Sequence, residues 1–491
     1  MTTSFNAGSL LDAPVRRTPE KTALIFEDTR LTFAELEAGA RRCAAILASL
    51  GVQAGDRVVL LLPDCPVFVQ AILGTMRLGA IAIPVTPALT ETDLRYILDD
   101  SGAVVVVARR ENTTLAFGGK ILSCGPLDFD FSAVVPRAVL HPSHADDLAL
   151  MMYTSGSTGR PKGVPHRHGD LLVMARQWAP EIVGDLGADT ILCTSKLSFA
   201  YGLLIQLCLG LAAGATVIQH GGAPEPGAVF ALLARHRPTL LFAVPTVYAT
   251  LIRAWPATTG CAAPLRLCYS SGENLPISLH RHWQELTGLA IVEGIGSTEA
   301  LGIYISNRPG RCQPGTLGEP LPGYEIRLVD PEGQPVASGQ EGRMLLRGPG
   351  LAPAYWNRPE VTAANMLPEG WFNTGDLCVE AQGRYRHLGR ADDMMKIGGQ
   401  WLSPIPVEDC LRQHPAVADC AVAGCHVQGL EYPAAFVVPR AGQVGNAALG
   451  GELRRYVHDR LPKYMCPVKV EFLATLPRTT TGKIQRHKLR H

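Results

Sequence analysis

The sequence predicts an α/β protein, with a large N-terminal domain of mostly parallel α/β subdomains, a small β-barrel-like region and a small α+β C-terminal domain. Three observations lead to this prediction. Short apolar runs alternate with longer helix-like stretches in the first half, the residue pattern changes near position 310, and a compact unit follows position 390. Because 491 residues exceed one ordinary hydrophobic core, we expect at least two domains.

The first half of the chain alternates between strand-like and helix-like segments. These segments lie at residues 58–62, 67–78, 81–85, 92–98 and 104–107. Such alternation is expected of a mostly parallel sheet covered by helices. Further strands are expected at residues 240–244, 265–269 and 289–292.

The most apolar long stretch runs from Leu203 to Ile218. It contains Gln206, Gly210 and Gly214, and it is shorter than the roughly 20 residues that a membrane-spanning helix needs. We therefore expect a buried helix and no membrane association.

Beyond position 310, glycine, proline and alternating apolar residues at 315–330 and 341–348 predict antiparallel strands. A folded C-terminal unit is then expected, with helices at 405–413 and 453–461 and strands at 418–422 and 434–438. The predicted domains are residues 1–390 and 391–491.

Composition and charge narrow the class of protein. Apolar residues make up 47% and charged residues 18%, as in a globular enzyme, and a net charge of +1 gives no support for binding nucleic acid. The start of the chain shows no signal peptide, and thirteen cysteines without a paired CxxC pattern indicate reduced core thiols. These features predict a cytoplasmic protein.

Residues 153–164, YTSGSTGRPKGV, follow the apolar run 148–152. Backbone N–H groups of such a small-residue loop can surround phosphate oxygens, with hydroxyl groups as further donors and Lys162 as a counter-charge. The spacing does not fit the P-loop pattern G-x-x-x-x-G-K-[ST]. A flexible linker is the alternative, but a linker needs neither the preceding strand nor the Pro-Lys-Gly sequence.

Four ordered motifs make the chain resemble the adenylate-forming superfamily of acyl-CoA synthetases, adenylation domains and luciferases. They are 154–163 (TSGSTGRPKG), 294–299 (GIGSTE), 374–376 (TGD) followed by 389–392 (GRAD), and 477–483 (PRTTTGK). The resemblance spans nearly the whole chain and implies ATP, Mg²⁺ and a thiol acceptor.

The resemblance also implies site residues. It assigns catalysis to Thr154, Glu299 and Lys483, with Glu299 coordinating Mg²⁺ through ATP and Lys483 bridging the carboxylate and the α-phosphate. Asp376 would hold the ribose and Arg390 would support it. The implied ATP and AMP contacts are Thr154, Ser155, Gly156, Ser157, Thr158, Gly159, Lys162, Gly272, Glu273, Ile295, Gly296, Ser297, Thr298, Glu299, Asp376, Arg390 and Lys483. Ile295 stands where the wider family often has an aromatic residue beside the adenine.

Residues 195–203, 295–304 and 306–309 resemble the benzoate-CoA ligase branch, which includes anthranilate-activating relatives. By that resemblance, the ring pocket is lined by Phe199, Ala200, Tyr201, Gly296, Gly302 and Ile303. Ordinary core packing is the alternative for Phe199 and Tyr201. Close relatives tend to carry His at the position of Gly302, so we expect a ring-substituted or somewhat longer aryl acid in place of plain benzoate.

The resemblance implies a second step in which a mobile C-terminal domain rotates about Asp392 and brings Gly398 and Gly399 to the thiol. Residues 451–491 carry ten Lys or Arg against three Asp or Glu, and Lys463 and Arg478 are among these cations. They could meet the phosphates of coenzyme A or the acidic helix of a carrier protein, and the sequence does not separate the two. A monomer or a homodimer is expected.

Other activities remain as alternatives. The same motifs occur in luciferase-like oxygenases, and a non-catalytic nucleotide-binding protein could keep the loop but lose the reaction. Residues 166–170, HRHGD, fit an HxxxD acyltransferase pattern or a metal pair, but such short patterns arise often by chance.

Overall fold

The computed structural model describes residues 4–112, 117–132, 140–155, 160–255, 264–397, 400–427, 430–478 and 484–490. Side chains are described for these residues except at 155, 400, 401 and 430. The chain forms two compact units, which are described separately below. Unit 1 comprises residues 1–326 and 346–372, and unit 2 comprises residues 327–345 and 373–491. The domain boundary near residue 390 remains a prediction.

Unit 1 contains a six-stranded sheet in the order β6-β5-β3-β4-β7-β8. Its strands are β3 (Arg57–Leu61), β4 (Ile81–Val85), β5 (Val105–Arg109), β6 (Lys120–Cys124), β7 (Leu148–Ser155) and β8 (Pro161–Arg167). All neighbours are parallel except β7 and β8, which form an antiparallel hairpin. The parallel strands predicted at 58–62, 81–85 and 104–107 are confirmed.

A nine-stranded sheet of unit 1 has the order β15-β14-β13-β12-β11-β9-β10-β1-β2. Its strands are β1 (Thr22–Phe26), β2 (Thr29–Thr32), β9 (Thr190–Cys193), β10 (Thr216–Gln219), β11 (Leu240–Ala243), β12 (Leu267–Ser270), β13 (Ile291–Ser297), β14 (Gly302–Ser306) and β15 (Glu319–Pro320). The central strands β1, β10, β9, β11, β12 and β13 are parallel. The strands predicted near 240, 265 and 289 are therefore neighbours in one sheet.

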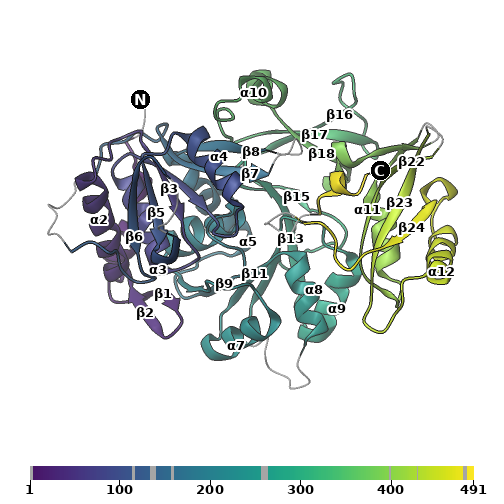
Figure 1. The fold of residues 1–491 in the computed structure, drawn as a ribbon, viewed down its shortest axis with the longest axis horizontal. Coiled ribbons are helices and arrows are strands. Elements are labelled where there is room, and N and C mark those ends of the chain that lie inside the picture. Colours follow the sequence, from purple (N-terminus) through teal and green to yellow (C-terminus); the bar gives the residue numbers. More distant parts are fainter. Residues whose placement is uncertain are drawn as a thin grey trace. The chain divides into compact units, whose positions relative to one another are not determined.

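The α-helices of unit 1 are α1 (Asp12–Arg17), α2 (Phe33–Ser49), α3 (Pro66–Arg77), α4 (Glu91–Ser101), α5 (Ala179–Ile182), α6 (Ala200–Leu203), α7 (Pro226–His236), α8 (Pro245–Arg253), α9 (Ile277–Thr287) and α10 (Pro359–Asn365). A capping box starts α2, because the Thr32 hydroxyl accepts from the Glu35 N–H and the Glu35 carboxylate accepts from the Thr32 N–H. Helices α2 and α3 pack side by side (Figure 1). A Cβ on Gly74 would lie 2.7 Å from the Cβ of Cys43, so glycine permits this close approach.

The apolar stretch at 203–218 differs from its prediction. It continues α6 as a π-helix, η5 (Leu204–Leu211), and the chain then turns at Gly214 into β10. The buried part is confirmed, since residues 203–211 are all buried. The strand was missed because a short apolar run has no periodicity that separates strand from buried helix. A second π-helix, η4 (Met174–Trp178), packs against the first.

Unit 2 holds most of a four-stranded sheet in the order β16-β17-β18-β19, in the region expected to be barrel-like. These strands are β16 (Glu325–Val329), β17 (Glu341–Arg347), β18 (Phe372–Ala381) and β19 (Arg384–Arg390). A second sheet, in the order β22-β23-β24, packs with helices α11 and α12 around a core that includes Val407, Val422 and Leu453. Its elements are β22 (Val417–Val427), β23 (Leu430–Pro439), β24 (Lys469–Phe472), α11 (Pro404–Arg412) and α12 (Ala447–His458).

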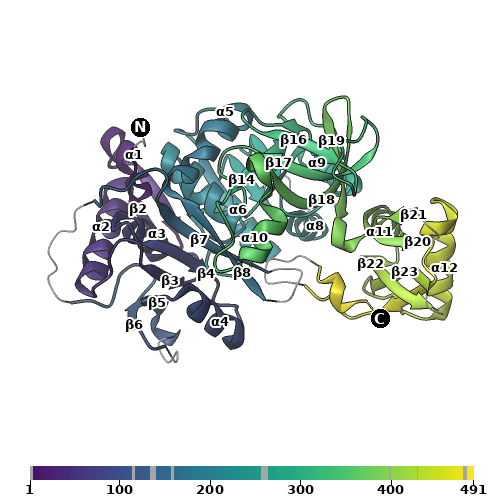
Figure 2. The same cartoon turned by 90° about the horizontal axis from the view of Figure 1, so that it is seen from above.

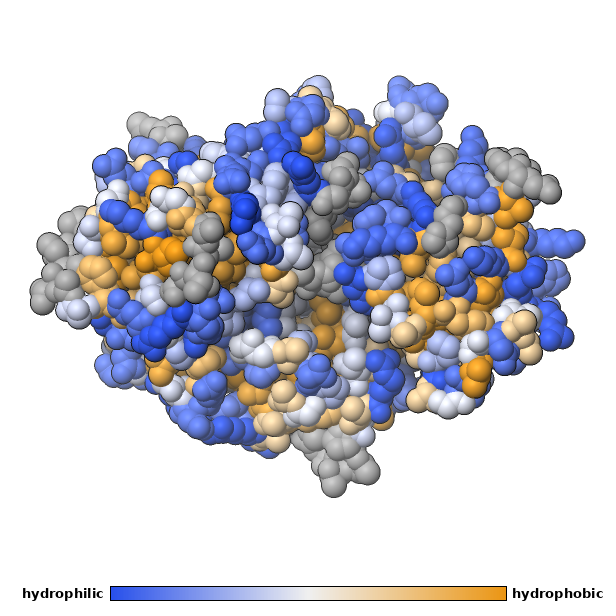
Figure 3. Space-filling model, in the orientation of Figure 1, coloured by the Kyte–Doolittle hydropathy of each residue, from blue (hydrophilic) through white to orange (hydrophobic). Residues whose placement is uncertain are grey.

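The surface of the molecule is mixed in character. Figure 3 shows hydrophilic residues across the viewed face, with hydrophobic residues exposed between them. Within the described ranges, no helix combines the length and the apolar character needed to cross a membrane. Ten cysteines of these ranges are buried free thiols.

The two histidines of HRHGD are both fully buried. His166 Nε2 lies 2.8 Å from the carbonyl oxygen of Thr298, and His168 Nδ1 accepts a 2.9 Å hydrogen bond from the Ala7 N–H. His166 thus joins β8 to Thr298, and His168 joins η3 (His168–Leu172) to the N-terminal turn η1 (Ala7–Ser9). Among the described residues, no group of three or more His, Cys, Asp or Glu could hold a metal.

We expect His168 to make the stability of the protein depend on pH. Burial lowers the pKa of His168 to about 4, whereas an unfolded histidine keeps a pKa of about 6.5. Between these values the unfolded chain binds more protons, so the free energy of unfolding falls as the pH falls, by about 2 kcal/mol from pH 7 to pH 5. Urea unfolding of the wild type and of His168→Asn at pH 7 and at pH 5 measures this change in the free energy of unfolding.

The His168→Asn variant keeps an acceptor for the Ala7 N–H but does not titrate in this range. Its loss of stability between pH 7 and pH 5 should be smaller than that of the wild type. An equal loss in both proteins would show that His168 is not responsible.

Candidate active site

The predicted phosphate-binding loop lies between two strands of one hairpin. Thr154 on β7 is directly opposite Lys162 on β8, so the hydroxyl and the ammonium group flank the loop from its two sides. Gly156, Ser157, Thr158 and Gly159 lie outside the described residues, as does the side chain of Ser155.

The hairpin is fastened to the C-terminal end of α4 through Asp100. The Tyr153 hydroxyl donates to Asp100 Oδ2 over 2.8 Å, and Arg358 Nη2 donates to Oδ1 over 3.1 Å. The Trp356 indole N–H donates to the Asp100 carbonyl oxygen over 3.1 Å. Burial and the bond to Asp100 raise the pKa of Tyr153, so its hydroxyl remains a donor. Tyr153 therefore secures the strand that carries the loop.

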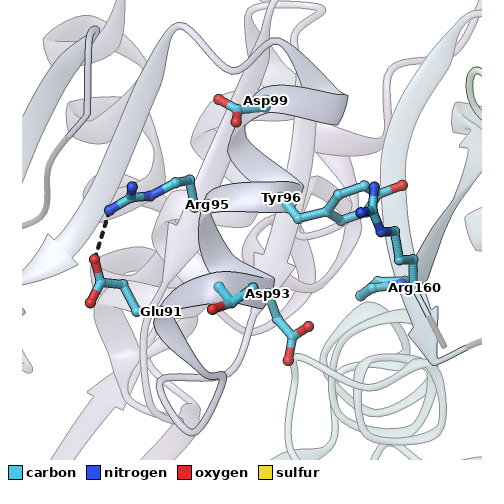
Figure 4. A pocket seen from close by; sticks show the side chains of 8 residues that line it. Glu91, Asp93, Arg95, Tyr96, Asp99 and Arg160 are labelled. Atoms are coloured by element: carbon cyan, nitrogen blue, oxygen red, sulfur yellow. Dashed lines mark hydrogen bonds and ion pairs between the residues drawn. The ribbon is translucent and has the colours of Figure 1, made fainter.

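A pocket of about 550 Å³ lies beside this end of the hairpin (Figure 4). It is lined by Glu91, Thr92, Asp93, Arg95, Tyr96, Asp99, Arg160 and Pro161. The guanidinium of Arg160 lies over the Tyr96 ring, 5.6 Å from its centroid, and Glu91 pairs with Arg95 on the other side of the helix. Three carboxylates would repel a triphosphate, so we do not assign this pocket to the nucleotide phosphates.

Two groups of residues predicted to contact the nucleotide lie at the carboxyl ends of neighbouring parallel strands. Gly272 and Glu273 follow β12, and Ile295 to Ser297 end β13. Thr246 donates to Glu273 Oε2 through both its N–H and its hydroxyl, which fixes the carboxylate beside β12. Open α/β sheets bind their ligands just outside the carboxyl ends of the strands. The residues predicted to contact the nucleotide lie at this edge of the sheet.

Tyr355 contacts both Lys162 of the motif 154–163 and Glu299 of the motif 294–299. Its hydroxyl donates to Glu299 Oε1 over 2.8 Å, and Lys162 Nζ lies 5.5 Å from the centroid of its ring. Two backbone hydrogen bonds of 2.8 Å reinforce this contact. The Ala352 N–H donates to the carbonyl oxygen of Glu299, and the Trp356 N–H donates to the carbonyl oxygen of Gly163. Tyr355 is 6% exposed. The segment 352–356 thus ties both motifs into one site.

The side chains of Val361 and Met366, in and just after α10, pack against the same cluster of Val164, Ala352 and Tyr355. Figure 2 shows α10 beside β8. This packing supports the segment that holds Tyr355 in place.

The predicted ring pocket is built around α6 and the β13–β14 pair. Phe199, Ala200 and Tyr201 are all half-buried, and the Tyr201 hydroxyl lies 3.4 Å from the Tyr269 carbonyl oxygen on β12. Side chains that only filled a core would be fully buried. Their partial exposure is compatible with the predicted pocket wall, which stays a prediction.

Gly296 and Gly302 lie close together where β13 and β14 pair. A Cβ on Gly296 would overlap the carbonyl oxygen of Gly302, so only glycine permits this approach. Ile303 pairs with Gly296, and Met174 Sδ accepts a 3.4 Å hydrogen bond from the Ile303 N–H. Leu301, just before β14, adopts a left-handed φ of 39°, a strained conformation for a leucine.

In unit 2, Asp376 on β18 faces Arg390 on β19. Arg390 Nη1 donates to Asp376 Oδ1 over 3.2 Å and to the Thr374 carbonyl oxygen over 2.6 Å, and His387 Nε2 lies 3.2 Å from Asp376 Oδ1. Burial acts to raise the pKa of Asp376, but Arg390 and His387 outweigh it and hold that pKa at about 2. Asp376 is therefore an ionised hydrogen-bond acceptor, which suits the predicted contact with ribose hydroxyl groups.

The segment that contains Lys483 is anchored on both sides within unit 2. Arg478 donates to Asp419 Oδ2 over 2.6 Å. Arg486 donates to Glu408 Oε1 over 2.8 Å and to Asp393 Oδ2 over 3.1 Å. Glu408 is 2% exposed, and although burial raises its pKa, Arg486 and Arg412 lower it below the usual value. Lys483, Gly398 and Gly399 themselves lie outside the described residues.

The remaining residues predicted for the thiol step lie in different parts of unit 2. Asp392 belongs to the short helix η7 (Ala391–Asp393), where its carbonyl oxygen accepts from Arg490. Lys463 belongs to η8 (Lys463–Met465). Asp419 already pairs with Arg478, so any phosphate at Arg478 has to compete with this carboxylate.

Sequence reasoning missed Asp100, Tyr355 and Arg486. Asp100 and Tyr355 lie in no motif that was singled out, and their partners are distant along the chain. The residues RPE at 358–360, which follow the Gly-rich stretch from 348 to 350, could have directed attention to Tyr355. Arg486 was counted only as part of the basic terminus.

Comparisons with known proteins identify the family of the chain. Residues 11–356 match the family model of the AMP-binding enzymes, and residues 406–483 match that of the AMP-binding enzyme C-terminal domain. The chain is 39% identical to the benzoate–CoA ligase of Thauera aromatica, over 96% of this chain and 92% of the relative. It is 35% identical to the 3-hydroxybenzoate–CoA ligase of Aromatoleum sp. (strain CIB), over 96% of this chain and 93% of the relative.

Among solved structures, the chain is similar to an anthranilate CoA ligase in complex with anthranoyl-AMP. The TM-score is 0.91 at 35% sequence identity, and the match covers 100% of this chain and 97% of the other.

We expect Tyr355→Phe to weaken nucleotide activation without unfolding the protein. The variant keeps the ring under Lys162 but loses the hydrogen bond to the Glu299 carboxylate, which is worth about 1.5–3 kcal/mol for a charged acceptor. Acid-dependent exchange of pyrophosphate into ATP should fall roughly tenfold, and half-maximal activity should require more Mg²⁺. Titration of exchange against Mg²⁺ measures both effects.

A double-mutant cycle with Glu299→Gln isolates the contact. In that background, Tyr355→Phe should have little further effect, because the charged acceptor is already gone. Independent, multiplicative losses from the two substitutions would contradict the role given to Tyr355.

Proposed function

The chain belongs to the AMP-binding enzyme family, and from this premise we propose that it activates an aromatic carboxylic acid with ATP and transfers the acyl group to coenzyme A. The products are an aryl-CoA thioester, AMP and pyrophosphate. The chain is an acid-thiol ligase of the AMP-forming type. The observation that carries this proposal is the assembly of Lys162 and Glu299 around Tyr355 in unit 1.

In the first step, a carboxylate oxygen of the acid attacks the α-phosphorus of ATP. The bond from this phosphorus to the oxygen bridging to the β-phosphate breaks, and pyrophosphate leaves with its electron pair. Positioning and positive charge supply most of the catalysis in such a transfer. We propose that Thr154 and Lys162 hold the leaving phosphates, together with the N–H groups of residues 155–159.

Glu299 is the carboxylate proposed to meet Mg²⁺. Mg²⁺ binds oxygen ligands and commonly combines one or two carboxylates with substrate phosphates. The Tyr355 hydroxyl orients Glu299 for this contact. When bound with ATP, the ion would neutralise charge that develops on the phosphates.

We propose that Asp376 receives the ribose hydroxyl groups and that Arg390 keeps Asp376 ionised. Ile295, at half-buried depth on β13, offers an apolar surface for the adenine, without the stacking that an aromatic ring would give. Lys483 is proposed to bridge the attacking carboxylate and the α-phosphate during adenylation.

The second step is proposed to be attack of a thiol on the acyl-adenylate carbonyl carbon. The carbon–sulfur bond forms, the bond to the AMP oxygen breaks, and the thiol proton leaves to solvent or base. Gly398 and Gly399 are proposed to border the thiol, Asp392 to act as the hinge, and Lys463 and Arg478 to meet phosphates. Coenzyme A is the acceptor, as in the aryl-CoA ligases that the chain resembles.

We propose a reducing compartment, the cytoplasm, for this enzyme. Its support is chemical: ten described cysteines are buried free thiols, which is typical of proteins that are kept reduced. A monomer or a homodimer is proposed, and size-exclusion chromatography with light scattering distinguishes them.

We expect acid-dependent exchange of labelled pyrophosphate into ATP with aromatic acids and little with aliphatic or amino acids. Lys483→Ala should reduce exchange by about 100-fold or more, because it removes the cation proposed to bridge the attacking carboxylate and the α-phosphate. The variant should still transfer acyl groups from a preformed aryl-adenylate to coenzyme A. Lys488→Ala, an exposed lysine of the same terminal segment, is the matched control and should retain exchange.

Each contrary result has a distinct meaning. Absence of exchange with every acid would leave only nucleotide binding. Exchange without thioester formation on coenzyme A, but with loading of a phosphopantetheine carrier protein, would replace the acceptor. Strong exchange with aliphatic acids alone would refute the ring pocket.

A further inference from the structure

We propose that Asp64 is a positioning residue for the aryl acid, because it holds the turn that carries one predicted wall of the ring pocket. This inference rests on the proposed function, since it needs residues 199–201 to line a pocket for the ring. Asp64 lies between β3 and α3, 133 positions before its partner Leu197, and belongs to none of the motifs described above.

The Asp64 carboxylate is buried and accepts a hydrogen bond on each of its oxygens. Asp64 is 2% exposed. The Leu197 N–H donates to Oδ1 and Gln206 Nε2 donates to Oδ2, each over 2.9 Å. Lys196, whose ammonium group donates to the His220 carbonyl oxygen, adds a positive charge that acts on this carboxylate. One buried acid thus binds the chain both before and after the predicted pocket wall.

The turn that carries this wall is compact. The Phe199 N–H donates to the Lys196 carbonyl oxygen over 2.9 Å, and a Cβ on Gly202 would overlap that oxygen. Gln206 Nε2 closes the turn with a second hydrogen bond, of 2.9 Å, to the Ser195 carbonyl oxygen. Because so compact a turn has little freedom of its own, restraint of its two ends sets the direction of the side chains between them.

Asp64 also connects the two sheets of unit 1. It follows β3 of the six-stranded sheet, which contains the hairpin β7–β8 with the predicted phosphate-binding loop. Its partners Leu197 and Gln206 lie between β9 and β10 of the nine-stranded sheet. A Cβ on Gly221, just after β10, would lie 3.1 Å from the Asp64 carbonyl oxygen, so the backbones pack closely as well. An acid that must meet ATP in a fixed geometry benefits from such a connection.

Stability alone is a weak reason for this arrangement. Burial raises the pKa of Asp64 and lowers the pKa of Lys196, so burial opposes both charges. Apolar residues in place of buried ionic groups often stabilise a protein. Gln206 Oε1 is also buried, with no hydrogen-bond partner among the described residues, and such unpaired atoms call for an explanation. Orientation of the pocket wall provides one.

The test measures KM in acid-dependent exchange of pyrophosphate into ATP, for the aromatic acid and for ATP in turn, each with the other saturating. The acid is whichever of benzoate, 2-aminobenzoate, 3-hydroxybenzoate and 4-hydroxybenzoate supports the fastest exchange in the wild type. We expect Asp64→Ala to raise KM for this acid about tenfold and to leave KM for ATP within about twofold. The variant releases Leu197 and Gln206 but keeps every residue proposed to contact the nucleotide.

Two further variants separate the hydrogen bonds from the charge. Asp64→Asn keeps an acceptor for the Leu197 N–H, and its N–H can donate to Gln206 Oε1 once that amide turns over. Its KM for the acid should therefore stay within about threefold of the wild type. Gln206→Leu removes the other hydrogen bond with an apolar side chain of similar size, and KM for the acid should rise about fivefold.

Arg77→Met is the matched control, because Arg77 is another buried charge, at the far end of the helix α3 that follows Asp64. Arg77 is 4% exposed, and its Nη1 donates to the Gly8 carbonyl oxygen over 2.9 Å. Thermal unfolding reports the stability of each variant. Arg77→Met should leave both KM values within about twofold of the wild type even where it lowers the midpoint of unfolding.

Equal increases in KM for the acid and for ATP in Asp64→Ala would overturn the positioning role while leaving aryl-acid activation intact. The same conclusion follows if Arg77→Met raises KM for the acid as much as Asp64→Ala does. If Asp64→Ala does not fold, Gln206→Leu decides, and an unchanged KM for the acid in that variant refutes the inference. Absence of exchange with every aromatic acid in the wild type would instead refute the proposed function itself.

Discussion

The hydrogen bond from Tyr355 to Glu299 is the contact on which the candidate site of unit 1 depends. A loop rich in glycine, serine and threonine has little apolar surface with which to pack, so neighbouring segments must fix its position. The segment 352–356 contacts the strand that follows the loop and the second motif, through Tyr355 and through backbone bonds to Glu299 and Gly163. Asp100 fastens the other side of the hairpin through Tyr153. The residues proposed to surround the phosphates can be small because large side chains, Tyr355 and Tyr153, hold the neighbouring strands in place.

Buried charge is arranged in the same manner in unit 2. Removing a carboxylate from water costs several kcal/mol unless hydrogen-bonded cations compensate for it. Asp376 has Arg390 and His387, and Glu408 has Arg412 and Arg486. Both pKa values are lowered despite burial, so both carboxylates remain ionised where ligands and anchors need a negative charge.

Much of the fold and the outline of the site follow from the sequence, and the reasons for failure are physical. The parallel strands of the first sheet were predictable because runs such as 58–62 are buried on both faces and contain almost only apolar residues. The strand β10 was lost inside the apolar stretch 203–218, where periodicity is uninformative. The motifs located Thr154, Glu299 and Asp376. The role of Tyr355 could not be inferred from its neighbours in the sequence, because it depends on two partners that lie 56 and 193 positions earlier in the chain.

The anchoring of residues 484–490 links the proposed catalytic lysine to the proposed hinge within unit 2. Arg486 binds Asp393, and Arg490 binds the carbonyl oxygen of Asp392, so the residues just after Lys483 are bonded to the turn that begins at the hinge. Replacing a buried ion pair by apolar residues often stabilises a protein, so stability alone is a weak reason for Arg486 to pair with Glu408. Geometric restraint is a better one. A lysine that must meet two reacting oxygens at the end of a long, flexible side chain gains from restraint of the chain on either side, and Arg478 and Arg486 restrain the described residues that flank the segment 479–483.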